Sequence, residues 1–230
     1  MLDTTSRTET LQGRFIAFIQ DKVFPCVGAK SALARHQMDI ITAGDIRCPR
    51  DDDRIYRDLA GFAGRYHAAP TAFQSFVVIF ETAGTLSEEA FEAALWARAA
   101  ALEKRDAAAG HTYDPRVSPR VDDPHFSLSF GGEAFFLVGL HPGASRPARR
   151  FEQPVLVFNP HDQFERLRDA DRYETLRASI IERDIAVAGS PNPMLARHGE
   201  ISEARQYSGR AVDDSWQCPF HSAFEIAHDS

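Results

Sequence analysis

The sequence predicts an α+β fold, in which a mainly antiparallel sheet is flanked by helices and an irregular C-terminal segment is wrapped on the domain. The first observation is a hairpin pattern: residues 126–130 alternate between apolar residues and serine, and Gly131 and Gly132 precede a second apolar run at 135–140. Two glycines suit a tight two-residue turn because both can adopt positive φ. The second observation is a set of helical patterns on both sides of this hairpin, typical of helices that cover a sheet.

The remaining elements follow from local patterns along the chain. The continuous apolar run at 75–80 is too short for an average helix and predicts a buried strand. A third strand is expected at 155–159, after Pro154. Thr85 or Ser87 is expected to cap a long helix that stops before Gly110. The other expected helices cover 8–23, a short piece after Gly28, 55–67, the end of 160–168 and 172–187.

Length and composition restrict the classes of protein. The 230 residues contain no linker, so a single domain over 1–230 is expected. The net charge of −7 provides no basic field for a phosphate backbone, which argues against a nucleic-acid partner. No apolar run approaches the roughly 20 residues of a membrane span, and residues 1–10 are polar, so we expect no membrane partner and a cytoplasmic location. The three cysteines are expected to be reduced thiols.

Polar loops next to the strands hold the candidate site residues. There is no GxGxxG, GxxxxGK[ST], HExxH or GxSxG motif. Three histidines lie in polar loops beside ordered elements, at His141, His161 and His198. Three arginines follow the first of these histidines, at Arg146, Arg149 and Arg150. Such a cluster can grip carboxylates in a bidentate manner, although a solvated loop that pairs with neighbouring acids would have the same composition.

Several long strings in this chain resemble a known family. In order from about Phe24 to Phe220, they are FPCVGAKSALA, SFGGEAFFLVGLHPGASRPARRF, FNPHDQFERLR, SPNPMLARHGEISEARQYSGR and WQCPF. They resemble the YqcI/YcgG family, in the branch that includes guanitoxin-pathway N-hydroxylases. The resemblance implies a haem-dependent oxygenase that carries haem b and N-hydroxylates a guanidine or amine group of an arginine-like small molecule. Its other partners would be dioxygen and an external electron donor, or a peroxide.

The implied haem needs an axial ligand and cations for its propionates. As the ligand we favour His141, because it leaves a strand end, then His161, then His198. A thiolate from Cys26 or Cys218 is the alternative. The cations expected near the propionates are Arg146, Arg149, Arg150 and Lys30. Glu133 or Glu152 could hold the second nitrogen of a ligating histidine.

A guanidinium substrate needs carboxylate partners, and catalysis needs groups that handle protons. Glu81, Glu200 and Glu203 are the expected substrate-binding acids, while Glu133 and Tyr207 are the expected catalytic residues. Taken singly, each of these has an ordinary structural explanation, as a surface carboxylate or a partly buried tyrosine.

Three other functions remain open from the sequence. The chain could be a haem carrier or gas sensor without turnover. It could be a mononuclear non-haem iron enzyme that uses two of the histidines and a carboxylate such as Glu200. It could also be a binding domain without any cofactor. A homodimer is left open.

Overall fold

The computed structural model describes residues 10–169, 171–196 and 199–224, and its centre is a five-stranded sheet. The strands are β1 (Met38–Ala43), β2 (Ser75–Phe80), β3 (Leu128–Phe130), β4 (Glu133–Leu140) and β5 (Val155–Pro160). They lie in the order β1-β2-β5-β4-β3. Only the β1–β2 pair is parallel, and the other three pairs are antiparallel. The predicted α+β fold with a mainly antiparallel sheet is confirmed.

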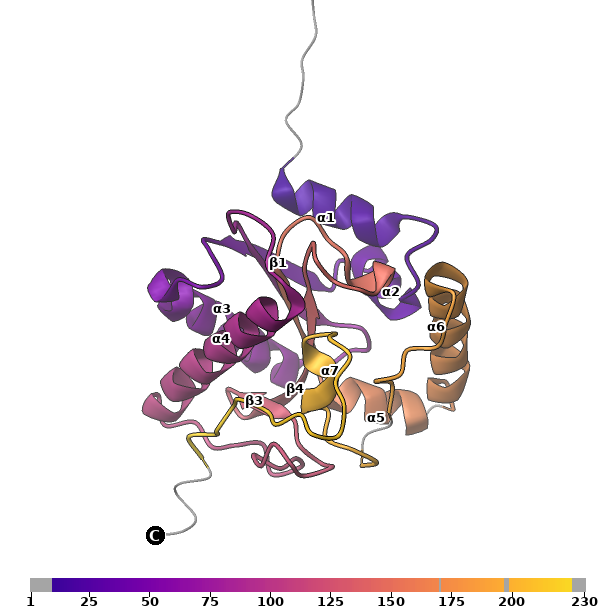
Figure 1. Cartoon of the computed structure of the whole chain (residues 1–230). Coiled ribbons are helices and arrows are strands. Elements are labelled where there is room, and N and C mark those ends of the chain that lie inside the picture. The colour runs from indigo at the N-terminus through magenta and orange to yellow at the C-terminus, as the bar shows by residue number, and fades with distance from the viewer. Residues whose placement is uncertain (1–9, 170, 197–198, 225–230) are drawn as a thin grey trace, which may run out of the picture.

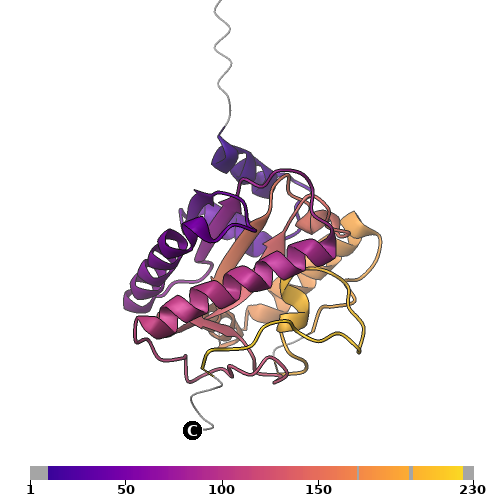
Figure 2. The same cartoon turned by 60° about the vertical axis from the view of Figure 1, so that its left-hand side comes forward.

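Helices cover both faces of the sheet (Figures 1 and 2). On one face lie α3 (Asp52–Ala68) and α4 (Glu88–Ala108), and on the other lie α1 (Leu11–Gln20), α2 (Val27–Ala34), α5 (Asp162–Asp169) and α6 (Tyr173–Ala188). The short helix α7 (Ala204–Tyr207) contacts β4. Two 3-10 turns, η1 (Pro49–Asp51) and η2 (Pro147–Arg149), complete the elements.

The alternation of side chains along the strands divides the apolar residues between the two faces. Phe76, Phe135 and Phe158 belong to the larger core cluster, which includes the buried residues of α3 and α4. Val77 and Val155 belong to a second cluster, with residues from α1 and the segment before α2. Helices therefore have apolar surface to cover on both sides of the sheet.

Local rules account for the best-predicted elements. The side chain of Ser87 accepts a hydrogen bond from the amide of Ala90, so Ser87 rather than Thr85 caps α4. Gly131 (φ 62°) and Gly132 (φ 76°) form the two-residue turn between β3 and β4. Positive φ at both positions is what such a turn requires, and the predicted hairpin is confirmed.

Strand β1 and the start of helix α3 differ from the sequence expectations. β1 was not predicted, because its residues are mostly half-buried at the edge of the sheet and Asp39 and Thr42 interrupt the apolar run. Helix α3 begins at Asp52, three residues before the expected start at 55. Asp52 and Asp53 lie in its first turn, where carboxylates interact favourably with the helix dipole.

The C-terminal segment packs on the domain over the described residues 199–224, as predicted. Tyr207 and Phe220 are buried in the larger core cluster, and both rings contact Trp96 of α4. Within the described ranges, the helices lack the combination of length and apolar character that a membrane crossing requires.

Candidate functional site

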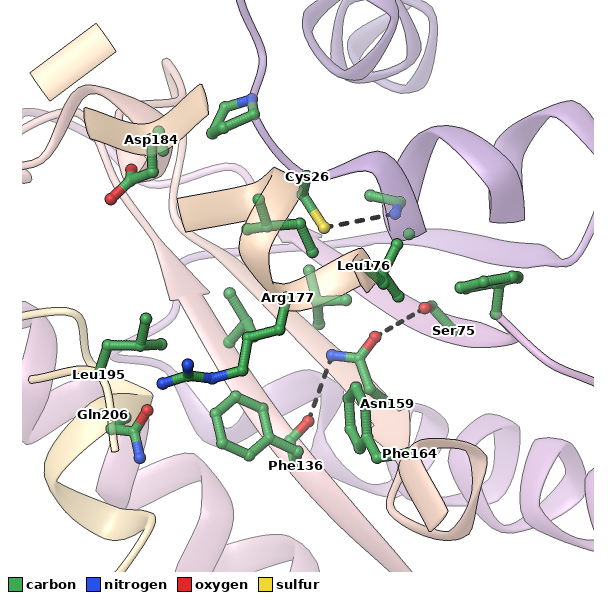
Figure 3. Close-up of a pocket in the computed structure, with 18 of the residues that line it drawn as sticks. Cys26, Ser75, Phe136, Asn159, Phe164, Leu176, Arg177, Asp184, Leu195 and Gln206 are labelled. Atoms are coloured by element: carbon green, nitrogen blue, oxygen red, sulfur yellow. Dashed lines mark hydrogen bonds between the residues drawn. The ribbon is translucent and has the colours of Figure 1, made fainter. Parts of the chain in front are cut away.

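A cavity of about 360 Å³ lies between the sheet and the helices α1, α2, α5 and α6. Its floor is the sheet surface that includes Phe136, Val138 and Val157, and its volume falls within the range of about 300–1,000 Å³ typical of ligand pockets. Polar groups on the floor are satisfied locally: Ser75 donates to the side chain of Asn159, which donates to the carbonyl of Phe136 (Figure 3). The cavity therefore has a mostly apolar floor with a few fixed polar positions.

Helix α6 forms one wall of the cavity. Leu176, Ile180 and Ile181 line it, yet α6 has no buried residue along its 16-residue length. An amphipathic helix normally buries its apolar stripe against packed side chains. In α6 this stripe borders the cavity instead, so the wall is only partly supported by protein contacts.

A buried imidazole and carboxylate face each other in another wall. His161 directly follows β5, and its Nε2 lies 3.2 Å from Oε1 of Glu203, with exposed fractions of 3% and 4% for the two residues. The two groups are within hydrogen-bonding distance, and the tautomer of the ring decides which of them donates. Both residues line the cavity.

The Glu203 carboxylate is held from its other side. Its Oε2 accepts hydrogen bonds from Ser127 Oγ at 3.2 Å and from Tyr207 Oη at 3.3 Å. Burial, and secondarily the charge of Glu203, raises the pKa of Tyr207 well above its ordinary value. Tyr207 therefore remains a neutral donor that positions Glu203. Tyr207 itself does not line the cavity, whereas Glu203 does.

Two of the predicted arginines line the cavity. Arg146 forms an ion pair with Asp184 and donates to the carbonyl of Ser190 at 3.0 Å. Arg149 donates to three carbonyls, those of Gly139, Tyr207 and Gln206, at 3.0–3.2 Å. Part of its surface faces the cavity, and withdrawal from bulk water lowers its pKa to about 10. Arg149 forms no ion pair with a carboxylate within the described part of the chain.

Most of the other predicted site residues lie elsewhere. His141 is buried and stacks on Phe91 of α4, with ring centroids 4.3 Å apart. The Arg150 side chain turns back to the carbonyls of Ala144 and Ser145, and Lys30 donates to the carbonyl of Asp21. Glu81 and Glu200 are exposed, and none of these residues lines the cavity. His198 lies outside the described residues.

The position of His141 has a simple cause. Leu140, which precedes it, lines the cavity, and successive residues of an extended chain point to opposite faces. His141 therefore faces α4, so its place at a strand end does not bring it to the cavity. His161 lines the cavity together with Phe136 and Asn159 at the same end of the sheet.

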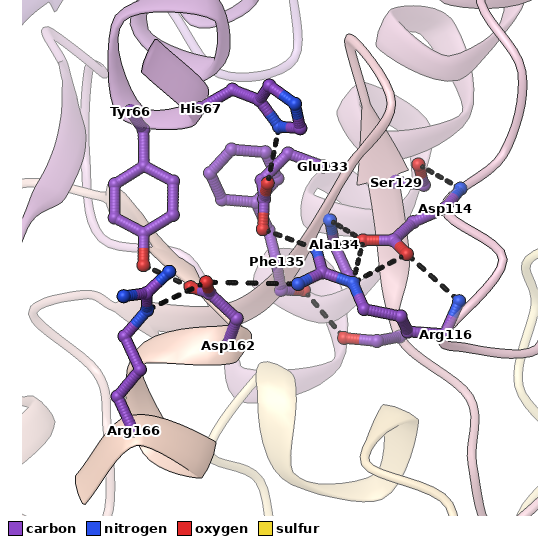
Figure 4. A network of polar contacts seen from close by, with 11 residues as sticks. Tyr66, His67, Asp114, Arg116, Ser129, Glu133, Ala134, Phe135, Asp162 and Arg166 are labelled. Carbon is purple, nitrogen blue, oxygen red and sulfur yellow. Dashed lines mark hydrogen bonds and ion pairs between the residues drawn. The ribbon is translucent and has the colours of Figure 1, made fainter. Parts of the chain in front are cut away.

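Glu133 belongs to a separate network of charged side chains (Figure 4). Arg116 donates to Glu133 at 2.8 Å and to both carboxylate oxygens of Asp114, and it lies 3.8 Å from Asp162. Tyr66 of α3 donates to Asp162. Burial raises the pKa of Glu133, which Arg116 opposes. This network does not line the cavity, and neither of the expected catalytic residues, Glu133 and Tyr207, is among the lining residues.

Cys26 is the thiol that reaches the cavity. It caps α2, where its sulfur accepts from the amide of Ala29 at 3.4 Å. Burial raises the pKa of this thiol, although the amides of Ala29 and Gly28 and the charge of Arg149 lower it. Cys218 packs against the larger core, and burial raises its pKa to about 12. Across residues 10–169, 171–196 and 199–224, no three His, Cys, Asp or Glu side chains converge closely enough to hold a metal ion.

Sequence reasoning missed Arg177 and Asp184, which also line the cavity. A signal was present: together with Ile180 and Ile181, they occupy positions i, i+3, i+4 and i+7 of α6. These are two charged residues on the apolar stripe of a helix. Figure 3 shows the Arg177 guanidinium extending into the cavity toward Leu195 and Gln206.

Comparison of the sequence with known proteins shows the family of the chain. The profile of the YqcI/YcgG family matches residues 15–221. The chain belongs to the YqcI/YcgG family. It is 28% identical over 211 residues to the "Uncharacterized protein YcgG" of Bacillus subtilis (strain 168), which covers 86% of this chain and 80% of that protein. No solved structure matches the chain significantly. The segment that matches the YqcI/YcgG family includes every cavity-lining residue named above.

Proposed function

We propose that the protein is a haem-dependent oxygenase that N-hydroxylates a guanidine or amine group of an arginine-like small molecule, with haem b in the cavity beside α6. The observation that supports it most is the buried His161–Glu203 pair in the wall of a largely apolar cavity that also contains arginines. An imidazole, an apolar slot and cations are the three features that haem needs from a protein.

The residues of the cavity fit haem in kind. His161 is the preferred axial ligand, and Arg149 is available for a propionate, whereas Arg146 is already paired with Asp184. At about 360 Å³ the cavity lies toward the lower end of ligand pockets, so a macrocycle requires its walls to move apart. Helix α6 is the wall that can do so at least cost, because none of its residues is buried.

When bound, haem would supply the activation of dioxygen or peroxide, with electrons from an external donor. The chain would supply position and charge. Glu203 fixes the orientation of the His161 ring, as carboxylate partners of ligating histidines do, and Tyr207 and Ser127 fix Glu203. Of the acids predicted to hold the substrate, Glu203 lines the cavity, and Asp184 adds a second carboxylate there. Asp184 is already paired with the guanidinium of Arg146.

The test is haem binding by the purified protein. With haemin added, a Soret band should appear and His161→Gly should abolish it, while added imidazole should restore it by entering the space left by the ring. His67→Gln is the matched control, because His67 is exposed and is not among the lining residues of the cavity. Absence of a Soret band in the haemin-supplemented wild type would contradict the proposal.

Two further readouts separate the alternatives. If His161→Gly keeps the band and Cys26→Ser loses it, Cys26 is the ligand instead. Turnover is tested by incubating the haem complex with L-arginine and related guanidines, dioxygen and a reductant. Mass spectrometry should find a product with one added oxygen atom. A haem complex that yields no such product from any guanidine or amine would favour the carrier or gas-sensor function.

A further inference from the structure

The cavity contains more positive charge than its own carboxylates balance. Arg146 and Asp184 neutralise each other. Arg177 is half-buried among apolar side chains and forms no hydrogen bond or ion pair with any residue in the described ranges. Holding a charge over apolar surface without a partner costs free energy. An anionic group from a ligand would remove this cost.

A second arginine, Arg149, lies near Gln206, which lines the cavity. Arg149 donates to the main-chain oxygen of Gln206, and Figure 3 shows the Arg177 guanidinium directed toward Gln206. The carbonyls around Arg149 are neutral acceptors, so its charge is solvated but not cancelled. Guanidinium groups bind carboxylates with paired, charge-assisted hydrogen bonds. Arg149 and Arg177 therefore both lie on the Gln206 side of an apolar cavity.

We propose that Arg177 and Arg149 form a carboxylate-binding subsite, which takes the anionic end of a ligand whose apolar body lies on Phe136, Val138 and Val157. If the proposed function holds, the bound carboxylates are the propionates of haem, so the choice of a porphyrin rests on that function. A fatty acid also carries a carboxylate on an apolar body. The subsite uses Arg177 in place of the sequence-predicted Arg150, which binds carbonyls of its own loop.

The subsite also connects ligand binding to helix α6. Arg177 lies on this helix, whose residues are all at least partly exposed. A carboxylate bound between Arg177 and Arg149 ties α6 to the loop that contains η2. The amides of α6 should therefore exchange hydrogen more slowly when a carboxylate-bearing ligand is bound.

The experiment compares ligands that differ only in their carboxylates. Protoporphyrin IX and its dimethyl ester are titrated into the wild-type protein, and both contain no iron, so axial ligation plays no part. Wild type should bind the diacid roughly tenfold or more tightly than the diester, as expected for loss of a charged hydrogen bond. Dodecanoate and dodecanol form a second acid-and-neutral pair, which tests the fatty-acid source.

Variants assign the preference to Arg177. Arg177→Gln should lose most of the preference for the diacid, while Arg172→Gln should keep it, because Arg172 is exposed just before α6. Hydrogen exchange of α6 should slow with the diacid and respond less to the diester. Porphyrin binding without any preference for the diacid in wild type would overturn the subsite, even if the variants do not fold. Failure of haemin and both porphyrins to bind, with dodecanoate still preferred over dodecanol, would instead overturn the haem function and keep the subsite.

Discussion

The two faces of the sheet are similar in hydrophobicity but differ in how their helices cover them. On the face toward α3 and α4, Phe158 contacts the rings of Phe76, Phe130 and Phe135, and α4 alone has ten buried residues. On the opposite face, α6 has none and borders the cavity. An apolar strand surface therefore does not determine whether a core or a binding site forms above it. The outcome depends on whether the side chains of the covering helix pack directly against the strands.

The charges of the two faces differ in the same way. On the packed face Arg98 of α4 pairs with buried Asp52 at 2.7 Å, and Glu103 accepts hydrogen bonds from Ser222 and from the amide of Ala223. On the cavity face Arg177 points into the open space. Buried charges with partners indicate structure, whereas a charge directed into a cavity indicates a ligand.

Truncating one apolar side chain on each face should produce the largest contrast. Phe158→Ala removes a fully buried ring and should lower the free energy of unfolding by about 3–5 kcal/mol. Ile180→Ala removes a half-buried side chain that borders the cavity, so we expect a loss of only about 1 kcal/mol. Urea unfolding of the ligand-free protein measures both. Equal losses would mean that α6 packs as tightly as α4.

The charged network in Figure 4 connects helices from the two faces of the sheet, since Tyr66 belongs to α3 and Asp162 to α5. Arg116→Gln leaves the buried carboxylates of Asp114 and Glu133 without their cation. The expected loss is about 2 kcal/mol, below that of a fully buried pair because the Arg116 side chain is 42% exposed. Arg47→Gln removes a cation that is 53% exposed and should change the unfolding midpoint in urea by much less. Similar effects of the two substitutions would show that the network contributes no more than a surface pair.

Glycines offer a finer comparison of the two faces. A Cβ at Gly139 would lie 2.7 Å from a ring carbon of Phe91 and 2.9 Å from Leu95, both in α4. Gly139→Ala should therefore destabilise the protein by about 1–3 kcal/mol. At Gly28 in α2, beside the cavity, the nearest atom would be at an ordinary 3.5 Å. Gly28→Ala should be neutral or stabilise by up to about 1 kcal/mol, because alanine favours helix. Thermal unfolding would distinguish the two, and tolerance of both would indicate that α4 can move away from the sheet.

Some features were predictable from the sequence because a local rule decides them. The Gly131-Gly132 turn and the Ser87 cap are of this kind, and so is the buried run of β2. The edge strand β1 was missed because it is half-buried and its neighbours come from distant residues.

The site depends on which face each residue takes, and this is a tertiary property. The sequence ranked His141 above His161 because His141 leaves a strand end, but the His141 ring stacks on Phe91 of α4, whereas His161 lines the cavity. Arg177 was recognisable in the sequence as a charged residue on the apolar face of α6. The pattern does not reveal, however, that this face borders a cavity instead of a packed core. His161 and Glu203 are 42 residues apart, so their pairing could not be read from spacing.

The burial of His141 on the packed side predicts a pH dependence of stability. Desolvation lowers its pKa below the ordinary 6.5, with a smaller contribution from Arg149, while Glu88 opposes the shift. The unfolded chain therefore takes up a proton near pH 6.5, whereas the folded protein resists protonation until a lower pH. The stability that this histidine contributes is present above pH 6.5 and is lost as the pH falls through its folded pKa. Urea midpoints between pH 8 and 5 should fall less steeply for His141→Gln than for wild type. Identical slopes for the two proteins would show that the His141 ring is readily protonated in the folded state, and that this side of the molecule is less tightly closed to water than its contacts indicate.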